Sequence, residues 1–441
     1  MSKDKIIVGL DIGTTKIACI VGKKTENEKV EILGYSKAKS IGVSKGMVTN
    51  IEDTVASIRE AVEKASSQSG VEIKVVNVGI AGHHIASMPH RGVSLRDDPD
   101  KEITLEEVEA LRQETYKIKL EPGRKIVDVI PQEYYVDGEL SARPQGMLGN
   151  KLEVNYHVVT ANVSAAKNIL TCLERAELNL EDMILEPIAS ADAVLDNDEK
   201  ELGVALVDIG GGTTDIAVFY QNMIRATASI PIGGNLITED IAKGCCILRR
   251  YAEEVKTKYG SAVKLEDDKN KVVSIPSGQK GSAPKEISFY NLSCIINARM
   301  AEIFDYVNKY IREVNSHHQL VAGIVLTGGG ANLKNIQQLA SFMTGMDVRI
   351  GTPNENLANS TEEEMKNTAY ATGVGLVIEG MNRDKLYEVI RSNDLNSNIV
   401  LDDSSSVQDS APKGPSRLDG ILEKLSRFFS GNAFKDKDDI E

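Results

Sequence analysis

The sequence predicts an α/β protein in which two related domains face each other across a cleft. A loop of glycine and threonine occurs twice, as DIGTTK over residues 11–16 and as DIGGGTTD over residues 208–215. Each copy lies between two apolar runs, which is typical of a strand, a tight turn and a second strand. The order strand, strand, strand, helix, strand, helix is expected in both halves and indicates related α/β domains.

Apolar periodicity places the elements of the first half. Ile51, Val55, Ile58 and Val62 recur at helical spacing and predict one amphipathic helix. The elements expected in order are paired strands over 6–22, a strand over 30–35, a helix over 51–68, a strand over 71–81 and a helix over 164–177.

Residues 85–162 break this order and are expected to form a small inserted α+β subdomain. Thr104 and Glu107 have the spacing of a capping box, which predicts a helix that ends near residue 117. Apolar strands are expected over 125–136 and 152–161.

The second half repeats the scheme and adds helices. A glycine triplet over residues 328–330 separates a predicted strand from a helix, and residues 264–288 are polar and are expected to be poor in strands. The other elements expected are a strand over 203–208, helices over 234–246, 250–258 and 291–315, a strand over 323–327, a helix over 333–344, a strand over 346–350 and a helix over 364–380.

The C-terminal segment has a different composition. Ser, Asn, Asp, Pro and Gly dominate residues 392–415, so residues 386–415 are expected to form a flexible linker. Residues 416–430 then predict an amphipathic helix that is too short and too charged to cross a bilayer but suits the plane of a membrane interface. Docking of this helix on the protein's own core or on a partner helix is the alternative. Its apolar stripe consists of Leu418, Ile421, Leu422, Leu425, Phe428 and Phe429, and an acidic tail follows over 431–441.

Bulk composition excludes several classes of function. The net charge of −14 argues against a nucleic-acid-binding surface and against adhesion of the whole body to anionic lipid. The five cysteines have no CxxC spacing, so neither a metal site nor a disulfide framework is expected.

Several motifs together resemble those of a known family. The two loops and the glycine triplet are similar to motifs of the actin, Hsp70 and sugar-kinase ATPase superfamily. VIPQEYYVDG over 129–138, IPIGGN over 230–235 and the C-terminal stripe resemble, more narrowly, the FtsA family of bacterial cell-division proteins. This resemblance implies an actin-like fold around an ATP cleft.

The resemblance also implies a division of the chain into parts. Actin's small outer subdomain would be missing on one side, and an unrelated subdomain would be inserted elsewhere. The expected parts are a first domain over 1–84 and 163–199 with 358–385 packed against it, the insertion over 85–162, a second domain with its core over 200–235 and 301–357 and an outer subdomain over 236–300, the linker, the amphipathic helix and the tail.

By the same resemblance, the loops would hold ATP and Mg²⁺. Backbone amides of glycine-rich turns form anion-binding concavities, and Asp11 and Asp208 at the strand ends suit a magnesium ion that keeps most of its water. Both aspartates are also explained as turn-capping residues. The residues expected to contact the nucleotide are Gly13, Thr14, Thr15, Lys16, Gly210, Gly211, Gly212, Thr213, Thr214, Gly233, Gly234, Glu253, Lys256, Gly328, Gly329 and Gly330.

Hydrolysis would need a group that orients the attacking water, and Glu186 is the candidate. Related filament proteins carry a water-activating glutamate at the matching place. Since Pro187 follows Glu186, the glutamate is also explained as the first residue of a helix. At most a slow ATPase is therefore expected.

The resemblance finally implies partners and a location. The chain would polymerise and would bind the tail of the tubulin-like protein FtsZ, with other division proteins as further partners. It would attach to lipid through residues 416–430. It would therefore act as a peripheral protein on the cytoplasmic face of the inner membrane, at the division septum. The main alternative is a soluble sugar or acetate-type kinase, which leaves the linker and helix unexplained. A chaperone ATPase would need a substrate domain for which no chain remains after residue 385, and the 129–138 segment argues against a rod-shape or pilus relative.

Overall fold

The computed structural model describes residues 5–25, 29–276, 284–314, 320–353, 356–358 and 361–383. The expected linker, amphipathic helix and acidic tail, residues 386–441, lie outside the described residues.

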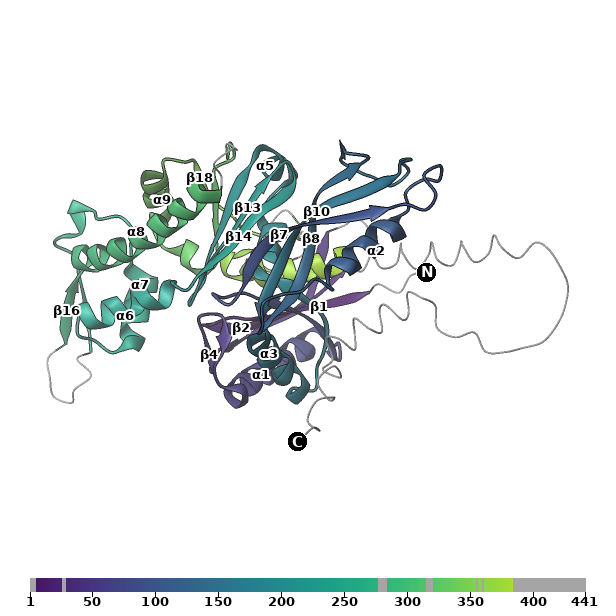
Figure 1. The fold of residues 1–441 in the computed structure, drawn as a ribbon. Coiled ribbons are helices and arrows are strands. Elements are labelled where there is room, and N and C mark those ends of the chain that lie inside the picture. Colours follow the sequence, from purple (N-terminus) through teal and green to yellow (C-terminus); the bar gives the residue numbers. More distant parts are fainter. Residues whose placement is uncertain are drawn as a thin grey trace, which may run out of the picture.

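The first half is built on a five-stranded sheet with the order β11-β6-β1-β2-β3 (Figure 1). Neighbours β1–β2 and β2–β3 are antiparallel, whereas β1–β6 and β6–β11 are parallel. The strands are β1 (Ile6–Ile12), β2 (Lys16–Lys24), β3 (Val30–Lys39), β6 (Val75–Ile80) and β11 (Asn179–Leu185), with a two-residue hairpin of β4 (Val43–Ser44) and β5 (Met47–Val48).

The second half has a sheet with the same topology. Its order is β14-β13-β12-β17-β18, again with three antiparallel strands followed by two parallel ones. The strands are β12 (Val204–Ile209), β13 (Thr214–Tyr220), β14 (Met223–Ile230), β17 (Ile324–Thr327) and β18 (Val348–Ile350). The expectation of two related α/β domains is thereby confirmed.

Each sheet is covered on both faces. Because consecutive residues of a strand point to opposite sides of its sheet, neighbouring residues belong to different cores. In β2, Ile17 and Cys19 pack into a core with α1 (Ile51–Ser69) and α3 (Val163–Arg175), while Ala18 and Ile20 face a second core. That second core lies between the two sheets and contains α4 (Glu186–Val194) and the helical residues 371–383. These two helices therefore join the halves.

The insertion forms its own sheet, with the order β7-β10-β8-β9, and one helix packs on it (Figure 1). Strand β8 of this sheet contacts β14 of the second half, where Glu133 Oε1 accepts a hydrogen bond from Arg225 at 2.7 Å. The elements are β7 (Ala86–Leu95), α2 (Leu105–Thr115), β8 (Arg124–Val136), β9 (Glu139–Ser141) and β10 (Lys151–Asn162). Thr104 and Glu107 form the expected capping box.

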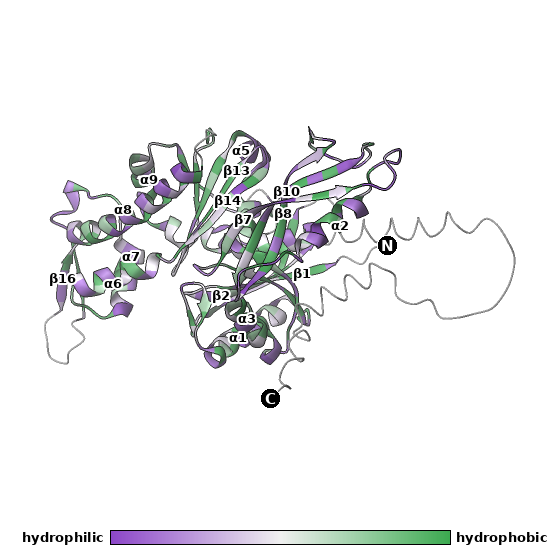
Figure 2. Cartoon of the chain, in the orientation of Figure 1, coloured by the Kyte–Doolittle hydropathy of each residue, from purple (hydrophilic) through white to green (hydrophobic). Residues whose placement is uncertain are grey.

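Helices cover the outer side of the second half. They show both hydrophilic and hydrophobic residues (Figure 2), as expected for helices with one face on a core. They are α6 (Gly234–Gly244), α7 (Arg249–Tyr259), α8 (Phe289–Val314) and α9 (Ile336–Thr344). The short helix α5 (Asn197–Leu202) has no buried residue and lies apart from them beside β13 (Figure 1).

Three expectations are corrected here. Residues 264–288 contain a hairpin of β15 (Val272–Ile275) and β16 (Lys285–Ser288). The helices expected from residues 333 and 364 begin later, at Ile336 and at residue 371, because short 3₁₀ turns precede them. Such turns are common at helix ends and carry no separate periodicity.

Candidate functional site

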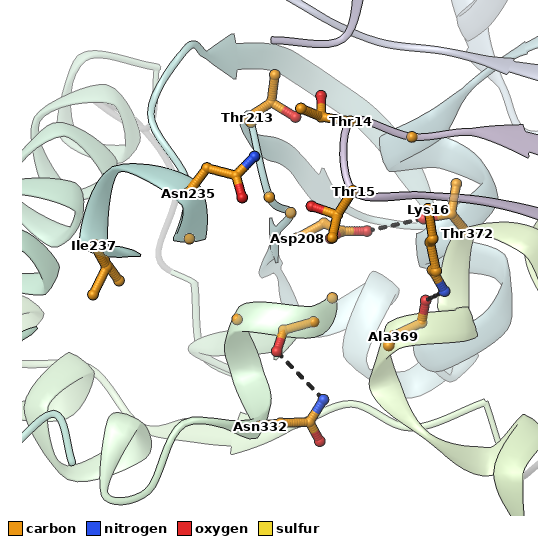
Figure 3. Close-up of a pocket in the computed structure, with 18 of the residues that line it drawn as sticks. Thr14, Thr15, Lys16, Asp208, Thr213, Asn235, Ile237, Asn332, Ala369 and Thr372 are labelled. Carbon is orange, nitrogen blue, oxygen red and sulfur yellow. Dashed lines mark hydrogen bonds between the residues drawn. The ribbon is translucent and has the colours of Figure 1, made fainter. Parts of the chain in front are cut away.

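A cavity of about 350 Å³ lies between the two halves, and the repeated loops form its centre (Figure 3). Segments far apart in the sequence meet here, because the turn between β1 and β2 and the turn between β12 and β13 face each other. The sequence-predicted residues that line it are Asp11, Gly13, Thr14, Thr15, Lys16, Glu186, Asp208, Gly210, Gly211, Gly212, Thr213, Gly234, Glu253, Lys256, Gly328, Gly329 and Gly330.

The two loops touch each other across the cavity. A Cβ placed on Gly211 would lie 1.9 Å from Thr15 Oγ1, and one placed on Gly212 would lie 2.5 Å from Thr14 Oγ1. Real side chains do not approach so closely, so the hydroxyls of one loop require the bare backbone of the other. Thr14 Oγ1 also accepts a hydrogen bond of 3.1 Å from the Gly46 amide.

The glycine triplet closes a third wall. Gly328 has φ +83°, which favours glycine, and a Cβ there would lie 2.2 Å from Asp208 Oδ1. Gly329, by contrast, has no atom within 4 Å of its Cβ position. The turn thus packs against the start of the second loop at Gly328 and leaves open space above Gly329.

Lys16 lies at the side of the cavity and points away from the loops. Its Nζ donates a hydrogen bond to the Ala369 carbonyl oxygen and lies 3.8 Å from the centroid of the Tyr370 ring (Figure 3). Burial lowers the pKa of Lys16, although the carboxylates of Asp11 and Asp208 oppose this shift. The lysine is the charged donor of the first loop, and it is engaged with the segment that precedes the last helix.

Acidic side chains dominate the polar groups of the cavity. Burial raises the pKa of Asp11 to about 6 and that of Asp215 to about 7. Burial also raises the pKa of Asp208, and it raises the pKa of Glu186 well above its usual range, with the neighbouring carboxylates adding to the latter shift. A pocket of this kind favours a positively charged occupant, because a cation would offset the clustered negative charge.

Hydrogen bonds fix two of these carboxylates. Asp208 Oδ2 accepts from the hydroxyl of Ser190 at 2.7 Å and from that of Thr372 at 3.2 Å. Asp215 Oδ2 accepts from Thr213 at 2.8 Å, while its Oδ1 is buried without a protein partner. An unpartnered buried carboxylate oxygen at a cavity wall is suited to a bound water or a hydrated ion.

Helices α6 and α7 form another wall of the cavity. Lys256 Nζ donates to Glu253 at 2.8 Å, to Thr238 Oγ1 at 2.8 Å and to the Gly234 carbonyl at 3.0 Å. Glu253 and Lys256 therefore form a network that ties α7 to the start of α6, and both still line the cavity.

Two of the expected residues lie behind the wall. Thr214 is buried and donates its hydroxyl to the Ile232 carbonyl at 2.8 Å. Gly233 packs on the second loop, where a Cβ would lie 2.7 Å from the Gly210 carbonyl oxygen. Both residues support the loop from behind.

Sequence reasoning missed other wall residues. Asp215 is the last residue of the DIGGGTTD motif but was not among the expected site residues, and its pairing with Asp208 across the hairpin could have indicated it. The cavity is also lined by Asn235, Asn332 and Thr372. No local sequence pattern predicts these residues, because tertiary packing brings them to the cavity.

Direct metal ligation is limited in the part of the chain that the structure describes. No group of three His, Cys, Asp or Glu side chains there is arranged to hold a metal ion.

Comparisons with known proteins agree with this architecture. The family model "Cell division protein FtsA" matches residues 205–375, and the model "SHS2 domain inserted in FTSA" matches residues 82–160. Cell division protein FtsA of Pseudomonas aeruginosa is 37% identical over 97% of this chain and 98% of its own length. Its Escherichia coli counterpart is 34% identical over 85% of this chain and 90% of its own length.

Among solved structures, the PilM-PilN type IV pilus biogenesis complex has a similar fold. A chain of it superposes with a TM-score of 0.61 at 18% identity and covers 85% of this chain and 98% of that chain. The expected actin-like fold with an inserted subdomain is thereby confirmed. Within the described residues, none of the helices has the length and apolar character needed to cross a membrane.

Sequence identity over nearly the whole length, the two family models and the fold agree, and the chain belongs to the FtsA family of cell division proteins.

Proposed function

We propose that the cavity between the halves binds ATP with Mg²⁺ and that the chain uses this nucleotide to assemble into membrane-attached filaments at the division site. The observation that carries the proposal is the contact between the two loops, in which Thr14 and Thr15 meet Gly212 and Gly211. A polyphosphate held there would be bound by amides from both halves at once, so binding would join the two domains.

The parts of the nucleotide would contact different walls. The phosphates would lie at residues 13–16 and 210–213, with the base and ribose between α7 and the open space above Gly329. Glu253 and Lys256 would face the ribose and adenine. Lys16 would exchange its Ala369 partner for a phosphate oxygen, because an ammonium group binds a negatively charged oxygen more strongly than a neutral carbonyl oxygen.

The carboxylates Asp11 and Asp208 would hold the magnesium ion, mainly through water. When bound, the ion neutralises phosphate charge and fixes the geometry of the polyphosphate. The raised pKa values of the two aspartates and the unpartnered Asp215 Oδ1 fit a cation at this place.

Hydrolysis would be slow, with Glu186 orienting the water. Burial and the neighbouring acids raise its pKa, so the ionised form that accepts a proton is disfavoured. The rate should therefore rise with pH, and Glu186→Gln should lower hydrolysis while ATP binding is retained.

Membrane attachment would depend on residues 416–430. Basic residues near anionic lipid contribute only about 1 kcal/mol each, so insertion of the apolar stripe must dominate. One short helix binds modestly, whereas linkage of many helices through a filament could raise the overall affinity by about 10²–10⁴. Assembly, FtsZ tethering and membrane attachment are then coupled.

Liposome co-sedimentation tests this function. The full chain is compared with a chain that ends at Pro415 and with Leu425→Glu/Phe428→Glu, each with and without ATP. The proposal expects that only the full chain pellets and that ATP increases the pelleted fraction. A matched control is Lys424→Gln, which changes charge but not the stripe and should still pellet.

The same experiment separates the alternative. If all three chains stay in solution while ATP still binds, the membrane role is wrong. An assay of phosphate transfer to small sugar or carboxylate acceptors would then test whether the chain is a sugar or acetate-type kinase.

A further inference from the structure

The last described helix connects the nucleotide cavity with the inserted subdomain. It comprises residues 371–383, and at 1.5 Å per residue it is about 20 Å long. One end lies at the cavity, the middle packs between the two sheets, and the other end meets α2 and β8 of the insertion.

Two contacts tie the first end to the cavity. Thr372 Oγ1 donates to Asp208 and lies 3.0 Å from Ser190 Oγ, so the helix contacts the carboxylate proposed to hold magnesium. Just before the helix, Lys16 Nζ donates to the Ala369 carbonyl. A bound nucleotide would attract Lys16 and reorganise the surroundings of Asp208, so both contacts respond to occupancy.

The middle of the helix is packed without free space. A Cβ on Gly375 would lie 1.7 Å from the Ala189 carbonyl oxygen of α4, and one on Gly380 would lie 2.5 Å from Asn77 Nδ2 of β6. Backbones that approach this closely move together, since packed interiors have low compressibility. A displacement of the first end therefore reaches the second.

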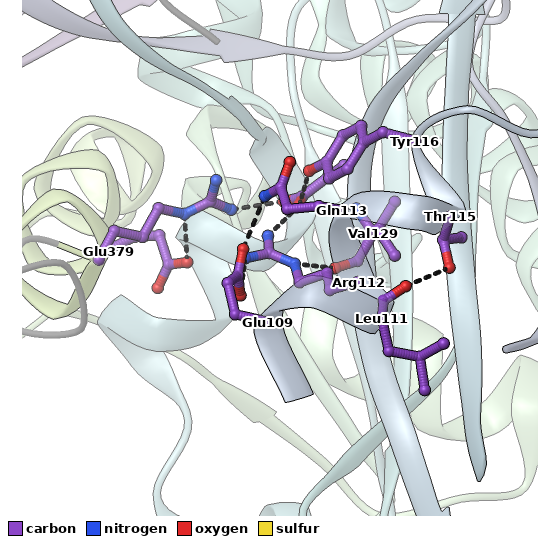
Figure 4. A network of polar contacts seen from close by, with 10 residues as sticks. Glu109, Leu111, Arg112, Gln113, Thr115, Tyr116, Val129 and Glu379 are labelled. Carbon is purple, nitrogen blue, oxygen red and sulfur yellow. Dashed lines mark hydrogen bonds and ion pairs between the residues drawn. The ribbon is translucent and has the colours of Figure 1, made fainter. Parts of the chain in front are cut away.

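The second end is held by a buried carboxylate of the insertion (Figure 4). Arg383 donates to Asp128 Oδ2, while Arg112 of α2 donates to Asp128 Oδ1 at 3.2 Å and to the Val129 carbonyl at 2.8 Å. Arg383 also donates to Glu379, one turn earlier on its own helix, at 2.9 Å. The Asp128 side chain is only 1% exposed.

The charges at this junction are strongly coupled. Burial would raise the pKa of Asp128, but Arg383 and Arg112 outweigh it and lower that pKa. Asp182 and Glu379, which also face Arg383, have pKa values raised by burial to about 6 and about 7. Arg383 is therefore the cation that interacts with three acids, Asp128, Asp182 and Glu379. Its position holds the end of the helix against the insertion.

We propose that helix 371–383 couples nucleotide occupancy to the position of the inserted subdomain, with Thr372 at the sensing end and Arg383 as the positioning residue at the other. This inference rests on the proposed binding of ATP. The coupling makes the insertion's placement, and with it any contact the insertion makes, depend on the nucleotide.

Coupling between two sites is reciprocal, which gives a direct test. If ATP shifts the junction, then breaking the junction must change ATP affinity although Arg383 does not touch the cavity. Arg383→Met in the full chain is expected to change the dissociation constant of ATP by about fivefold or more. The matched control is Arg96→Met, which removes a buried arginine whose partner, the partly exposed Glu107 at 3.0 Å, also belongs to the insertion, and which should leave the affinity unchanged.

A second variant guards against misfolding. Asp128→Asn/Arg383→Met removes both charges of this pair, so Asp128 does not remain as a buried carboxylate that has lost Arg383, and the double variant should change ATP affinity as the single variant does. Hydrogen exchange of α2 provides the reverse readout, and ATP should alter it in the parent chain but not in Arg383→Met.

The outcomes are distinct. A change in ATP affinity in the Arg383 variants but not in Arg96→Met supports the coupling. Equal ATP affinity in all folded variants, with α2 exchange insensitive to ATP, overturns it while the proposed function stands. If the parent chain binds no ATP, the proposed function fails and this inference fails with it.

Discussion

The two loops are the same length and occupy the same place in two sheets of the same topology, yet they carry different residues. Register pairs Ile12 with Ile17 and Ile209 with Thr214, so residues 13–16 correspond to residues 210–213. Thr14 and Thr15 of the first loop thus correspond to glycines in the second. The hydroxyls of one loop fit the empty space of the other, and two identical loops of the first type would collide.

Charge is divided between the loops in the same way. Lys16 corresponds to Thr213, and Ala18, which pairs with Asp11, corresponds to Asp215, which pairs with Asp208. The first half therefore supplies a cation and the second half an additional acid. The duplicated scaffold gives the positions, whereas the functional asymmetry comes from a few substitutions on it.

The insertions differ between the halves as well. The first half carries its extra subdomain between β6 and β11, and the second carries α6 to α8 between β14 and β17. Equivalent connections in the opposite half hold little more than one helix. Each half has therefore extended a different edge of the same fold.

The largest expected effect comes from removing the difference between the loops. Gly211→Val should lower ATP affinity by about 5- to 150-fold, because forced overpacking costs about 1–3 kcal/mol. A titration with a fluorescent ATP analogue measures this. Adding Thr15→Ala should restore part of the affinity, because it removes the hydroxyl that the new side chain would meet. Unchanged binding in Gly211→Val would show that the two loops do not grip one ligand.

Loss of the first loop's cation should come next. Lys16→Met is expected to weaken ATP binding by about 10-fold or more, since a hydrogen bond to a charged group contributes about 1.5–3 kcal/mol. Calorimetric titration measures the affinity. Lys37→Met removes a nearby exposed lysine that pairs with Glu364 and should have no effect. Equal loss in both variants would mean that general charge, and not the loop position, matters.

Gly328→Ala tests the third wall. Alanine at φ +83° should lower the free energy of unfolding by about 1–2 kcal/mol, and the clash with Asp208 adds to this. Gly329→Ala, one residue on, should be nearly neutral. Denaturant unfolding of both variants gives the comparison, and equal stability would contradict the close packing of Gly328.

The last expected effect is a pH dependence of stability to which Asp215 contributes, whereas its counterpart in the first half, Ala18, cannot titrate. Burial raises the pKa of Asp215 from 3.8 to about 7, so the folded chain holds a proton that the unfolded chain loses. Without ligand, this group's contribution to stability is therefore lost as pH rises from about 4 to about 7. Asp215→Asn should be less sensitive to pH over this range than the parent chain. Identical pH profiles would mean that Asp215 is not perturbed.

The sequence predicted the scaffold well and the cavity in part. The strand and turn pattern around residues 11–16 and 208–215 is local, so it revealed both hairpins and the relation between the halves. The identity of facing residues is not local. Thr372 and Asn332 reach the cavity only because a helix and a turn from elsewhere pack there, and the fit of Thr15 to Gly211 depends on how the halves join.

Other differences have physical causes of the same kind. β15 and β16 form a hairpin that buries little apart from Ile275 and Ile287, so its strands carry a weak pattern. The start of the last helix was predicted too early because Asn367 caps a short 3₁₀ turn before it. Arg383 and Asp128 are far apart in sequence, and no spacing rule could pair them.

A crystal structure of the chain with Mg²⁺ and a non-hydrolysable ATP analogue tests the central claim most directly. The triphosphate is expected between residues 13–16 and 210–213, the metal beside Asp11 and Asp208, and Lys16 turned from Ala369 toward the phosphates. A nucleotide bound elsewhere, or one held by a single half with the loops apart, would contradict it.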